Sequence, residues 1–302
     1  MLTRAVQTYL SVRRASGFCL KKVGYHLGSF AAYSDAKRRR YVNSDTAIEW
    51  ARQAPSIHMR ARRLGDVIRL ARYLHAEEAR HEIPPAVFGS ERRVRRPPYI
   101  LSDQQIRQLI QLAAGSGYRT LRRQTYSTLF ALLSCTGLRV SEAIRLRYDD
   151  ITPDGLVIRA TKFQKSRLVP LHETARAGLE RYLQQRRPYA PLDDHVFISL
   201  RRKPLLGADV DTAFQTVAVK MGLPHGRGQR RPTPHSLRHA FAVRALQSCP
   251  DERDRITQHT LLLSTYLGHG KAADTYWYLE AVPELMRGIA ERAEAYVTGG
   301  AP

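Results

Sequence analysis

Cysteine is scarce in this chain, and the few cysteines lie far apart. Cys19, Cys135 and Cys249 are odd in number and show no pair at metal-binding spacing. The sequence therefore predicts neither a disulfide framework nor a paired-cysteine metal site, which fits a reducing cytoplasm. We expect the three side chains to be small buried apolar groups.

Long apolar runs, internal repeats and low-complexity segments are missing as well. No uncharged stretch is long enough to span a bilayer, and the N-terminus lacks the apolar core of a signal peptide. We therefore expect a cytoplasmic protein without a membrane-spanning segment. The 302 residues, 43% of them hydrophobic, suffice for two globular domains with a core in each.

Acidic residues are few compared with basic ones. Lys and Arg number 49 against 27 Asp and Glu, which gives a net charge of +22. Such an excess favours a polyanionic partner, and nucleic acid is a simpler partner than an anionic membrane. The excess is densest in residues 1–96, with 20 basic and eight acidic residues, against 29 and 19 in the remaining 206.

A basic, proline-containing segment at residues 91–98 predicts a linker. It separates an N-terminal domain at residues 1–90 from a C-terminal domain at 99–302. The first domain is expected to be a helical bundle, because apolar residues recur at three- and four-residue spacing from residue 2, at 47–50 and at 59–74.

Arginines gather on the last of these helical segments. Five apolar residues share one face of the helix: Leu64, Val67, Ile68, Ala71 and Leu74. The arginines lie largely elsewhere on it: Arg60, Arg62, Arg63, Arg69 and Arg72. A solvated charged face is one interpretation. Their concentration favours a surface that contacts phosphates.

The C-terminal part alternates helical and strand patterns. Ser102 and Gln105 form a capping box that starts a helix, and a second apolar helix at 126–134 runs into Gly137. Two strands are expected at 157–160 and 167–171, and a short one at 196–199. Helices are expected at 175–185 and 209–220, and the fold class is mainly α with a small β-sheet.

Three short motifs in this part carry groups suited to phosphodiester chemistry. The first motif contains Arg139 and ends at Glu142 (Thr-Gly-Leu-Arg-Val-Ser-Glu). The second contains His235 and Arg238 (His-Ser-Leu-Arg-His), and the third ends at His269 (Leu-Gly-His). Arginines hold phosphate oxygens in a planar fork, and histidines move protons near neutral pH. A tyrosine from the run Tyr276-Trp-Tyr278 can attack phosphorus.

Each motif also has a structural interpretation. Arg139 could pair with Glu142 on one helix face. His235 and His239, four residues apart, resemble two zinc ligands on a helix, but the further ligand and the catalytic carboxylate are not evident, so His239 is expected to be structural. On a helix Tyr276 and Tyr278 point to nearly opposite sides, so at most one of them should enter a site.

Taken in order, these motifs resemble the tyrosine recombinase family, also called the phage integrase family. The resemblance covers roughly the whole chain, with the specific motifs in its C-terminal two-thirds. The nine-residue spacing from His269 selects Tyr278 as the nucleophile, and the resemblance assigns catalytic roles to Arg139, His235, Arg238 and His269. It also predicts a lysine hairpin at 161–167, in which Lys162, eight residues before Pro170, is the catalytic lysine and Lys165 the alternative.

The resemblance implies a site-specific recombinase that forms a 3′-phosphotyrosine and uses no metal or other cofactor. The two domains would close around double-stranded DNA as a C-shaped clamp, with four like or unlike protomers on two duplexes. The residues at 283–297 would form a helix packed on its own domain or on a neighbouring subunit.

An apparent insertion at 248–260 lengthens the distance from Arg238 to His269, and this feature is similar to transposon-linked relatives. Two other functions share part of the pattern. One is a nicking and closing activity like that of type IB topoisomerases, and the other is a DNA-binding regulator without catalysis. Retention of the whole residue set argues against the second.

Overall fold

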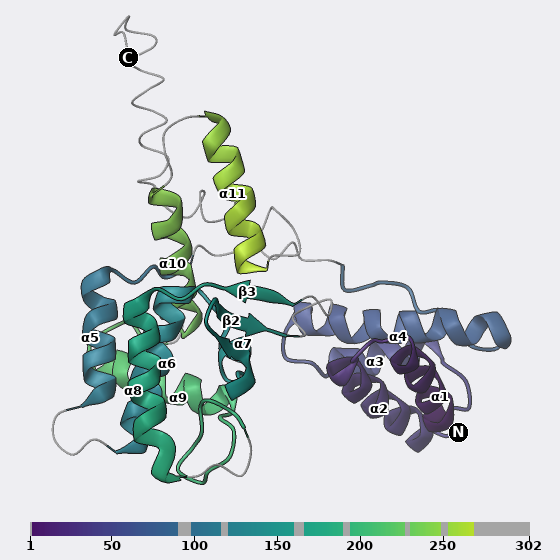
Figure 1. Ribbon diagram of the computed structural model, residues 1–302. Helices are drawn as coiled ribbons and strands as arrows, with labels where there is room; N and C mark the ends of the chain where they lie inside the picture. The colour runs from purple at the N-terminus through teal and green to yellow at the C-terminus, as the bar shows by residue number, and fades with distance from the viewer. Residues whose placement is uncertain are drawn as a thin grey trace, which may run out of the picture. The chain divides into compact units, whose positions relative to one another are not determined.

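The computed structural model describes residues 2–89, 98–115, 120–159, 166–189, 194–226, 230–248 and 253–268, the last range with side chains from 258 onward. The chain divides into two compact units, Met1–Arg95 and Arg96–Pro302 (Figure 1). Each unit buries an apolar cluster of its own. Most of the expected linker lies outside the described residues, so the domain boundaries stay a prediction.

The first unit is a helical bundle. Its helices within the described residues are α1 (Leu2–Ala15), α2 (Lys21–Ala36), α3 (Ser44–Arg52) and α4 (Ile57–Glu77). The side chain of Asn43 accepts the Thr46 N–H at 3.1 Å and starts α3, and Ser56 accepts the Met59 N–H at 3.3 Å and starts α4. The rings of Phe30 and Trp50 pack 5.4 Å apart in the core.

Helix α4 has the expected apolar face. Leu64, Val67, Ala71 and Leu74 are buried in the core of the first unit, and Ile68 packs against it half-buried. Because these positions recur every three or four residues, they lie along one side of the helix and leave the other side to the arginines. The predicted helix and its core face are confirmed.

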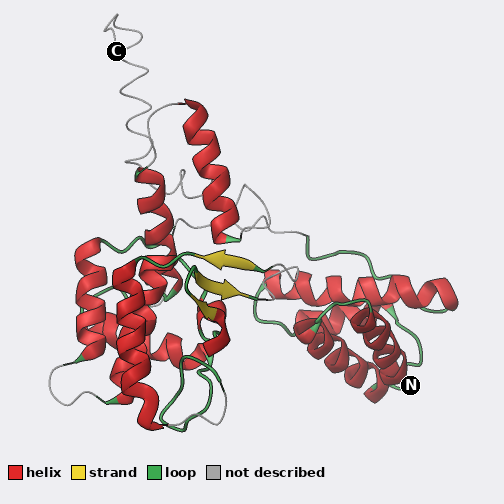
Figure 2. Ribbon diagram, viewed as in Figure 1, coloured by secondary structure: helices red, strands yellow, loops and turns green. Residues whose placement is uncertain are grey.

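The second unit consists of helices with a small sheet beside them (Figure 2). Its described helices are α5 (Asp103–Ala114), α6 (Leu121–Thr136), α7 (Val140–Ala143), α8 (Glu173–Arg186), α9 (Gly207–Lys220), α10 (His235–Gln247) and α11 (Arg253–Leu267), with the short 3₁₀ helices η1 (Tyr148–Asp150) and η2 (Arg187–Tyr189). Its strands are β1 (Ile151–Thr152), β2 (Gly155–Ile158) and β3 (Arg167–Val169). The expected fold class, mainly α with a small β-sheet, is confirmed.

The three strands form one antiparallel sheet in the order β1-β2-β3. Leu156 faces Val169, and Ile158 faces Arg167. Only glycine fits at the start of β2, since a Cβ on Gly155 would lie 2.3 Å from the Val169 carbonyl oxygen at a φ of +143°. The register therefore places Arg167 at the end of β3 that adjoins the expected lysine hairpin.

Aromatic and aliphatic side chains lock the helices of the second unit together. Phe130 of α6 and Phe214 of α9 meet edge to face, with ring centroids 5.6 Å apart. Tyr182 of α8 is buried, and its hydroxyl lies 3.1 Å from that of Thr125 on α6. A smaller buried cluster joins α10 to α11 and includes Leu267 at the end of α11. These contacts position the helix ends that carry the candidate site.

One expected strand did not form. Residues 196–199 make only an isolated bridge between Ile198 and Pro204. The Ser199 N–H donates to the Lys203 carbonyl at 2.8 Å and the Arg202 N–H to the Ser199 carbonyl at 2.9 Å. The chain therefore reverses before a ladder can extend, although Val196 and Ile198 are as buried as the apolar pattern indicated.

The expectation of buried cysteines was wrong for the two that are described. Cys19 lies exposed in the connection between α1 and α2. Cys135 is exposed near the end of α6, where its thiol donates to the Leu132 carbonyl at 3.4 Å. Cys249 lies outside the described residues. Both described positions are at or beyond a helix end, where the core does not cover the side chain.

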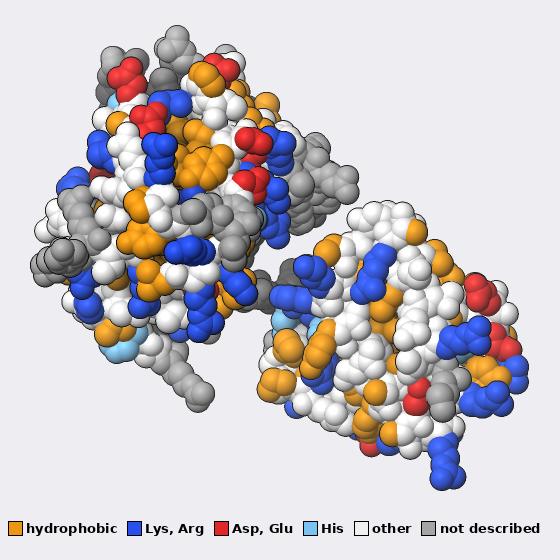
Figure 3. Space-filling view, turned by 60° about the horizontal axis from the view of Figure 1, so that its bottom comes forward, with side chains coloured by type: hydrophobic (Ala, Val, Ile, Leu, Met, Phe, Trp, Pro, Cys, Tyr) orange, Lys and Arg blue, Asp and Glu red, His pale blue; other side chains and the backbone are white. Residues whose placement is uncertain are grey.

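Basic side chains are spread over both units on the face drawn in Figure 3, where acidic ones are fewer. This distribution accords with the net charge of +22. Within the described part of the chain, no helix combines the length and the apolar character needed to cross a membrane.

Deletion of residues 1–96 should weaken the salt dependence of DNA binding. Each lost phosphate contact lowers the slope of log Kd against log salt concentration by about 0.9. Binding of a fluorescent duplex would be titrated at several salt concentrations with the whole and the shortened chain. A full-length variant with Arg62→Gln and Arg72→Gln, both exposed on α4, should give an intermediate slope. An unchanged slope after deletion would place the phosphate contacts in residues 97–302.

Candidate active site

Helix α6 ends in a turn that only glycine can make. Gly137 has a φ of +61°, and its N–H donates to the Leu133 carbonyl at 3.0 Å. A Cβ at this position would lie 2.5 Å from the Phe241 ring on α10. The turn buries Leu138 and delivers Arg139 to the N-terminus of α7.

Arg139 pairs with Glu142 across the single turn of α7. Its Nη1 donates to Glu142 Oε1 at 2.7 Å, and its main-chain N–H donates to Oε2 at 3.0 Å. The ion pair foreseen between these residues is therefore present. It does not bury the arginine, because 28% of the Arg139 side chain remains exposed against 8% for Glu142.

A second arginine, Arg167 at the start of β3, shares the same carboxylate. Its Nη2 lies 2.8 Å from Glu142 Oε2, and its Nη1 lies 3.2 Å from Oε1. Burial raises the pKa of Glu142, but the hydrogen bonds from Arg167 and Arg139 outweigh burial and hold that pKa at about 2. Glu142 is therefore an anion at neutral pH, held between two guanidinium groups.

The end of α11 receives hydrogen bonds from two of the expected catalytic arginines. Arg139 Nη2 donates to the Gly268 carbonyl at 2.8 Å, and Arg238 Nη2 donates to the Leu267 carbonyl at 2.8 Å. Arg238 Nη1 also donates to the Gly137 carbonyl at 2.6 Å, and the residue is only 1% exposed. Segments separated by 25 to 129 residues thus meet in one cluster. We call it the arginine cluster, and it consists of Arg139, Glu142, Arg167, Arg238 and the carbonyls of Leu267 and Gly268.

His235 is the first residue of α10 and lies three positions before Arg238. The Thr233 N–H donates to Ser236 Oγ at 3.1 Å and fixes the start of this helix. Desolvation by the surrounding protein lowers the pKa of His235 to about 4, and the positive charges of Arg238 and Arg139 act in the same direction. The residue is still exposed to solvent, and its imidazole is neutral at pH 7, able to accept a proton.

His239 packs beside His235, as its structural interpretation predicted. The two rings meet edge to face with centroids 4.5 Å apart. Among the described residues, no group of three or more His, Cys, Asp or Glu side chains is placed to hold a metal ion.

Several residues expected to be functional lie outside the described residues: Lys162, Lys165, His269, Tyr278 and the segment 283–297. Of the predicted catalytic set, the structure brings together Arg139, His235 and Arg238. Three members of the arginine cluster have no signal in the sequence that marks them as part of the site: Arg167, Leu267 and Gly268. The sequence indicates only a hairpin end and strand start at Arg167 and the Leu-Gly-His motif at the other two, because no local pattern reveals a contact across the fold.

The arginines expected to contact phosphates are partly engaged within the first unit. Arg60 Nε donates to the Ala54 carbonyl at 2.9 Å, the Arg63 guanidinium lies 5.3 Å from the centre of the Trp50 ring, and Arg69 pairs with Asp66. Arg62 is exposed. A DNA contact by these four arginines stays a prediction, and three of them also make contacts within the first unit.

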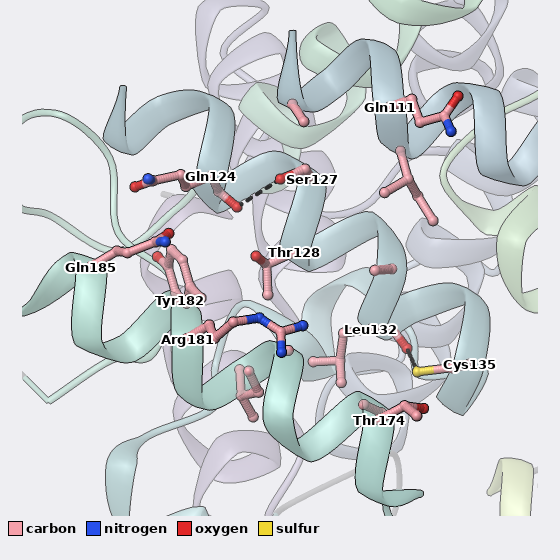
Figure 4. A pocket seen from close by; sticks show the side chains of 16 residues that line it. Gln111, Gln124, Ser127, Thr128, Leu132, Cys135, Thr174, Arg181, Tyr182 and Gln185 are labelled. Atoms are coloured by element: carbon pink, nitrogen blue, oxygen red, sulfur yellow. Dashed lines mark hydrogen bonds between the residues drawn. The ribbon is translucent and has the colours of Figure 1, made fainter. Parts of the chain in front are cut away.

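A cavity of about 410 Å³ lies between α5, α6 and α8 (Figure 4). Ser127 Oγ donates to the Gln124 carbonyl at 3.1 Å, and the Cys135 thiol to that of Leu132 at 3.4 Å. These polar groups at the cavity are therefore satisfied within α6. None of the arginine cluster lines it, so the chemistry of the site is carried by the cluster and not by this cavity.

Residues 100–283 match the family described as Phage integrase family. A Sinorhizobium fredii protein that its name describes as an integrase/recombinase is 36% identical over 96% of each chain. The tyrosine recombinase XerD of Proteus mirabilis is 33% identical over 75% of this chain and 69% of its own. The integrase of transposon Tn1549, solved in complex with transposon right end DNA, shares the fold with a TM-score of 0.63 at 17% identity, over 95% of this chain and 98% of that one.

Replacement of Gly268 by alanine should loosen the arginine cluster. Gly268 has a φ of +65°, and a Cβ there would lie 2.9 Å from Arg167 Nη1. The left-handed backbone alone costs about 1–2 kcal/mol for an L-residue with a side chain. We expect Gly268→Ala to lower the free energy of unfolding by that amount in a urea titration. Gly207→Ala is the control, since a Cβ at Gly207 meets nothing within 4 Å. Equal stability of both variants would contradict the crowding at Gly268.

Proposed function

The chain belongs to the phage integrase family, whose members cut and rejoin DNA strands in site-specific recombination, and on this premise we propose that Tyr278 attacks the scissile phosphorus and forms a 3′-phosphotyrosine. One observation carries the proposal. Arg238 donates to the Leu267 carbonyl and Arg139 to the Gly268 carbonyl, the two carbonyls that immediately precede His269, which lies nine residues before Tyr278. The two arginines proposed to bind the phosphate therefore contact the segment that immediately precedes His269 and, nine residues later, Tyr278.

Arg139 and Arg238 hold the non-bridging oxygens of the attacked phosphate. The charge on these oxygens grows as phosphorus becomes five-coordinate, and fixed guanidinium groups stabilise that charge without reorganising. Arg238 is buried and held by main-chain carbonyls, whereas 28% of the Arg139 side chain is exposed to solvent. Glu142 orients Arg139 and does not fully neutralise it, because the carboxylate is shared with Arg167.

His235 accepts the proton of the Tyr278 hydroxyl. A phenol is a weak nucleophile at neutral pH, so attack requires a base. The lowered pKa of His235 keeps its ring neutral and able to take that proton, and the negative phosphate then favours the protonated ring. His269 assists in proton transfer and in holding the phosphate.

Lys162 donates the proton that the departing strand needs. As the Tyr278 oxygen bonds to phosphorus, the bond from phosphorus to the 5′ oxygen breaks, and that oxygen takes a proton from the ammonium group. The register of the sheet supports this role, because β2 and β3 flank the expected hairpin and Arg167 at its base belongs to the arginine cluster.

The 5′ hydroxyl of another strand completes the reaction. It attacks the phosphotyrosine, expels the Tyr278 oxygen and restores a phosphodiester, so the bond energy is conserved and no high-energy cofactor is consumed. Exchange between two duplexes requires four active sites, and we infer a tetramer of like or unlike protomers on DNA. The two domains are proposed to close around double-stranded DNA as a clamp.

Replacement of Tyr278 by phenylalanine should abolish the covalent adduct. The substrate is a duplex enriched from a random-sequence library by the wild-type protein and then nicked near the cut, so that cleavage releases a short strand. The adduct is measured on a denaturing gel. Binding should stay within about twofold of wild type, because one hydroxyl adds little to many phosphate contacts.

Tyr276→Phe is the matched control and should keep the adduct. An adduct that persists in Tyr278→Phe would refute the assignment of the nucleophile. A wild-type protein that binds the duplex without an adduct would instead indicate a regulator without catalysis. Relaxation of a supercoiled plasmid without exchange between two sites would indicate a nicking and closing enzyme.

Replacement of Lys162 by alanine should slow cleavage about 10²- to 10⁴-fold, the usual contribution of a positioned acid. A duplex with sulfur at the 5′-bridging position should restore the rate, because a thiolate leaves without protonation. Lys165→Ala, the other lysine of the segment, should cleave both substrates at the wild-type rate. If the sulfur substrate fails to rescue Lys162→Ala while binding is intact, Lys162 is not the general acid.

A further inference from the structure

Glu142 receives four hydrogen bonds from two arginines, and this sharing has a consequence for the charge of the site. Arg139 contributes two of them, at 2.7 and 3.0 Å, and Arg167 contributes the other two, at 2.8 and 3.2 Å. Arg167 thus holds both carboxylate oxygens with its two terminal nitrogens, a forked geometry that fixes orientation as well as distance.

We propose that Arg167 is a positioning residue for strand cleavage, which through Glu142 holds Arg139 in place and keeps it electrophilic. This inference rests on the proposed function of the cluster and deepens it. Arg167 acts through Glu142, because both of its terminal nitrogens bind that carboxylate, and its side chain is 14% exposed, half the value for Arg139.

The balance of charge shows why a second arginine is needed. A carboxylate bound to Arg139 alone would offset the charge of that guanidinium, and only Arg238 would remain to face the phosphate. With Arg167 present, three guanidinium groups face one carboxylate, and the cluster carries a net charge of +2. A phosphodiester carries one negative charge, and its five-coordinate transition state carries two. The cluster therefore matches the transition state better than the ground state, which is the condition for catalysis.

The packing around Arg167 leaves it little freedom to move. Gly268 has no side chain, and the space that its Cβ would take lies 2.9 Å from Arg167 Nη1 and 3.6 Å from Arg139 Nη1. At the other end, Arg167 is held in the sheet by its pairing with Ile158, two residues before the buried Val169. Arg167 consequently ties the sheet to the end of α11 through the same carboxylate that orients Arg139.

The first test compares a charged and a neutral scissile group in full-length protein. The probe is the nicked duplex selected by the wild-type protein, made with either a phosphate or a methylphosphonate at the mapped cut. Arg167→Gln should slow single-turnover cleavage of the phosphate about 10²-fold, the order of loss for one group that stabilises an oxyanion. The methylphosphonate, which lacks one negative charge, should lose far less. DNA affinity should be nearly unchanged.

Arg244→Gln is the matched control for the loss of an arginine that binds both a carboxylate and a main-chain carbonyl. Arg244 also binds a carboxylate and a main-chain carbonyl, Asp103 Oδ1 and the Ser134 oxygen, both at 2.7 Å, but outside the arginine cluster. Any loss of stability in this variant should change the rates on the two substrates by the same factor. Loss of activity that is equal on both substrates in Arg167→Gln would overturn the proposal.

The second test removes the carboxylate together with the arginine. In Glu142→Gln/Arg167→Gln, Arg139 and Arg238 again give a net charge of +2, and the glutamine oxygen can still accept a hydrogen bond from Arg139. We expect the double variant to cleave about tenfold faster than Arg167→Gln, because the Glu142 carboxylate that would offset the charge of Arg139 has been removed. A purely structural role predicts that the double variant cleaves no faster, and that result would overturn the proposal.

Arg167→Lys keeps the charge and loses the fork, so it should cleave at an intermediate rate. Arg167→Lys also replaces Arg167→Gln in the comparison of the two substrates if Arg167→Gln does not fold, which thermal unfolding of each variant would reveal. The adduct formed by the wild-type protein distinguishes failure of the proposed function from failure of the role of Arg167. Without a wild-type adduct on the nicked duplex, the proposed function itself fails. With a wild-type adduct but no difference between the substrates in any Arg167 variant, only the role of Arg167 fails.

Discussion

Two main-chain carbonyls at the end of α11 are the acceptors on which the arrangement of the site depends. The last turn of a helix leaves its carbonyl oxygens without partners, and it carries a partial negative charge that attracts cations. Arg238 satisfies the carbonyl of Leu267, and Arg139 satisfies that of Gly268. Without these bonds the helix end would be unsatisfied, and the two arginines would lose their direct contacts with the chain that leads to His269.

Burial of charge constrains the same region. Removing a guanidinium group from water is costly unless hydrogen bonds replace the lost hydration. Arg238 obtains those bonds from the Gly137 and Leu267 carbonyls, and Glu142 obtains its bonds from two arginines. Partners that hold the cluster together without cancelling its charge are what a site for an anionic substrate requires. Stability and function therefore depend on the same contacts.

The first unit reuses its arginines in a comparable way. Arg60 binds a main-chain carbonyl of its own bundle, and the guanidinium of Arg63 lies over the Trp50 ring. Cation–aromatic and carbonyl contacts leave the charge in place while they fix the side chain. A surface built in this manner can keep a positive field for DNA and still be rigid, whereas a freely solvated set of arginines would lose more entropy on binding.

Local patterns in the sequence determined most of the helices, the capping box at Ser102, the glycine turn at Gly137 and the order of the three motifs, because each depends on neighbours within a few residues. The resemblance carried by these motifs led to the family. Only the tertiary structure decided which groups share Glu142. Arg167 contacts Glu142 across 25 residues, and Gly268 contacts Arg139, the partner of Glu142, across 129 residues. No periodicity in the sequence encodes contacts of that range. The expected strand at 196–199 failed for the same reason, since strand pairing depends on a partner that lies beyond the local sequence.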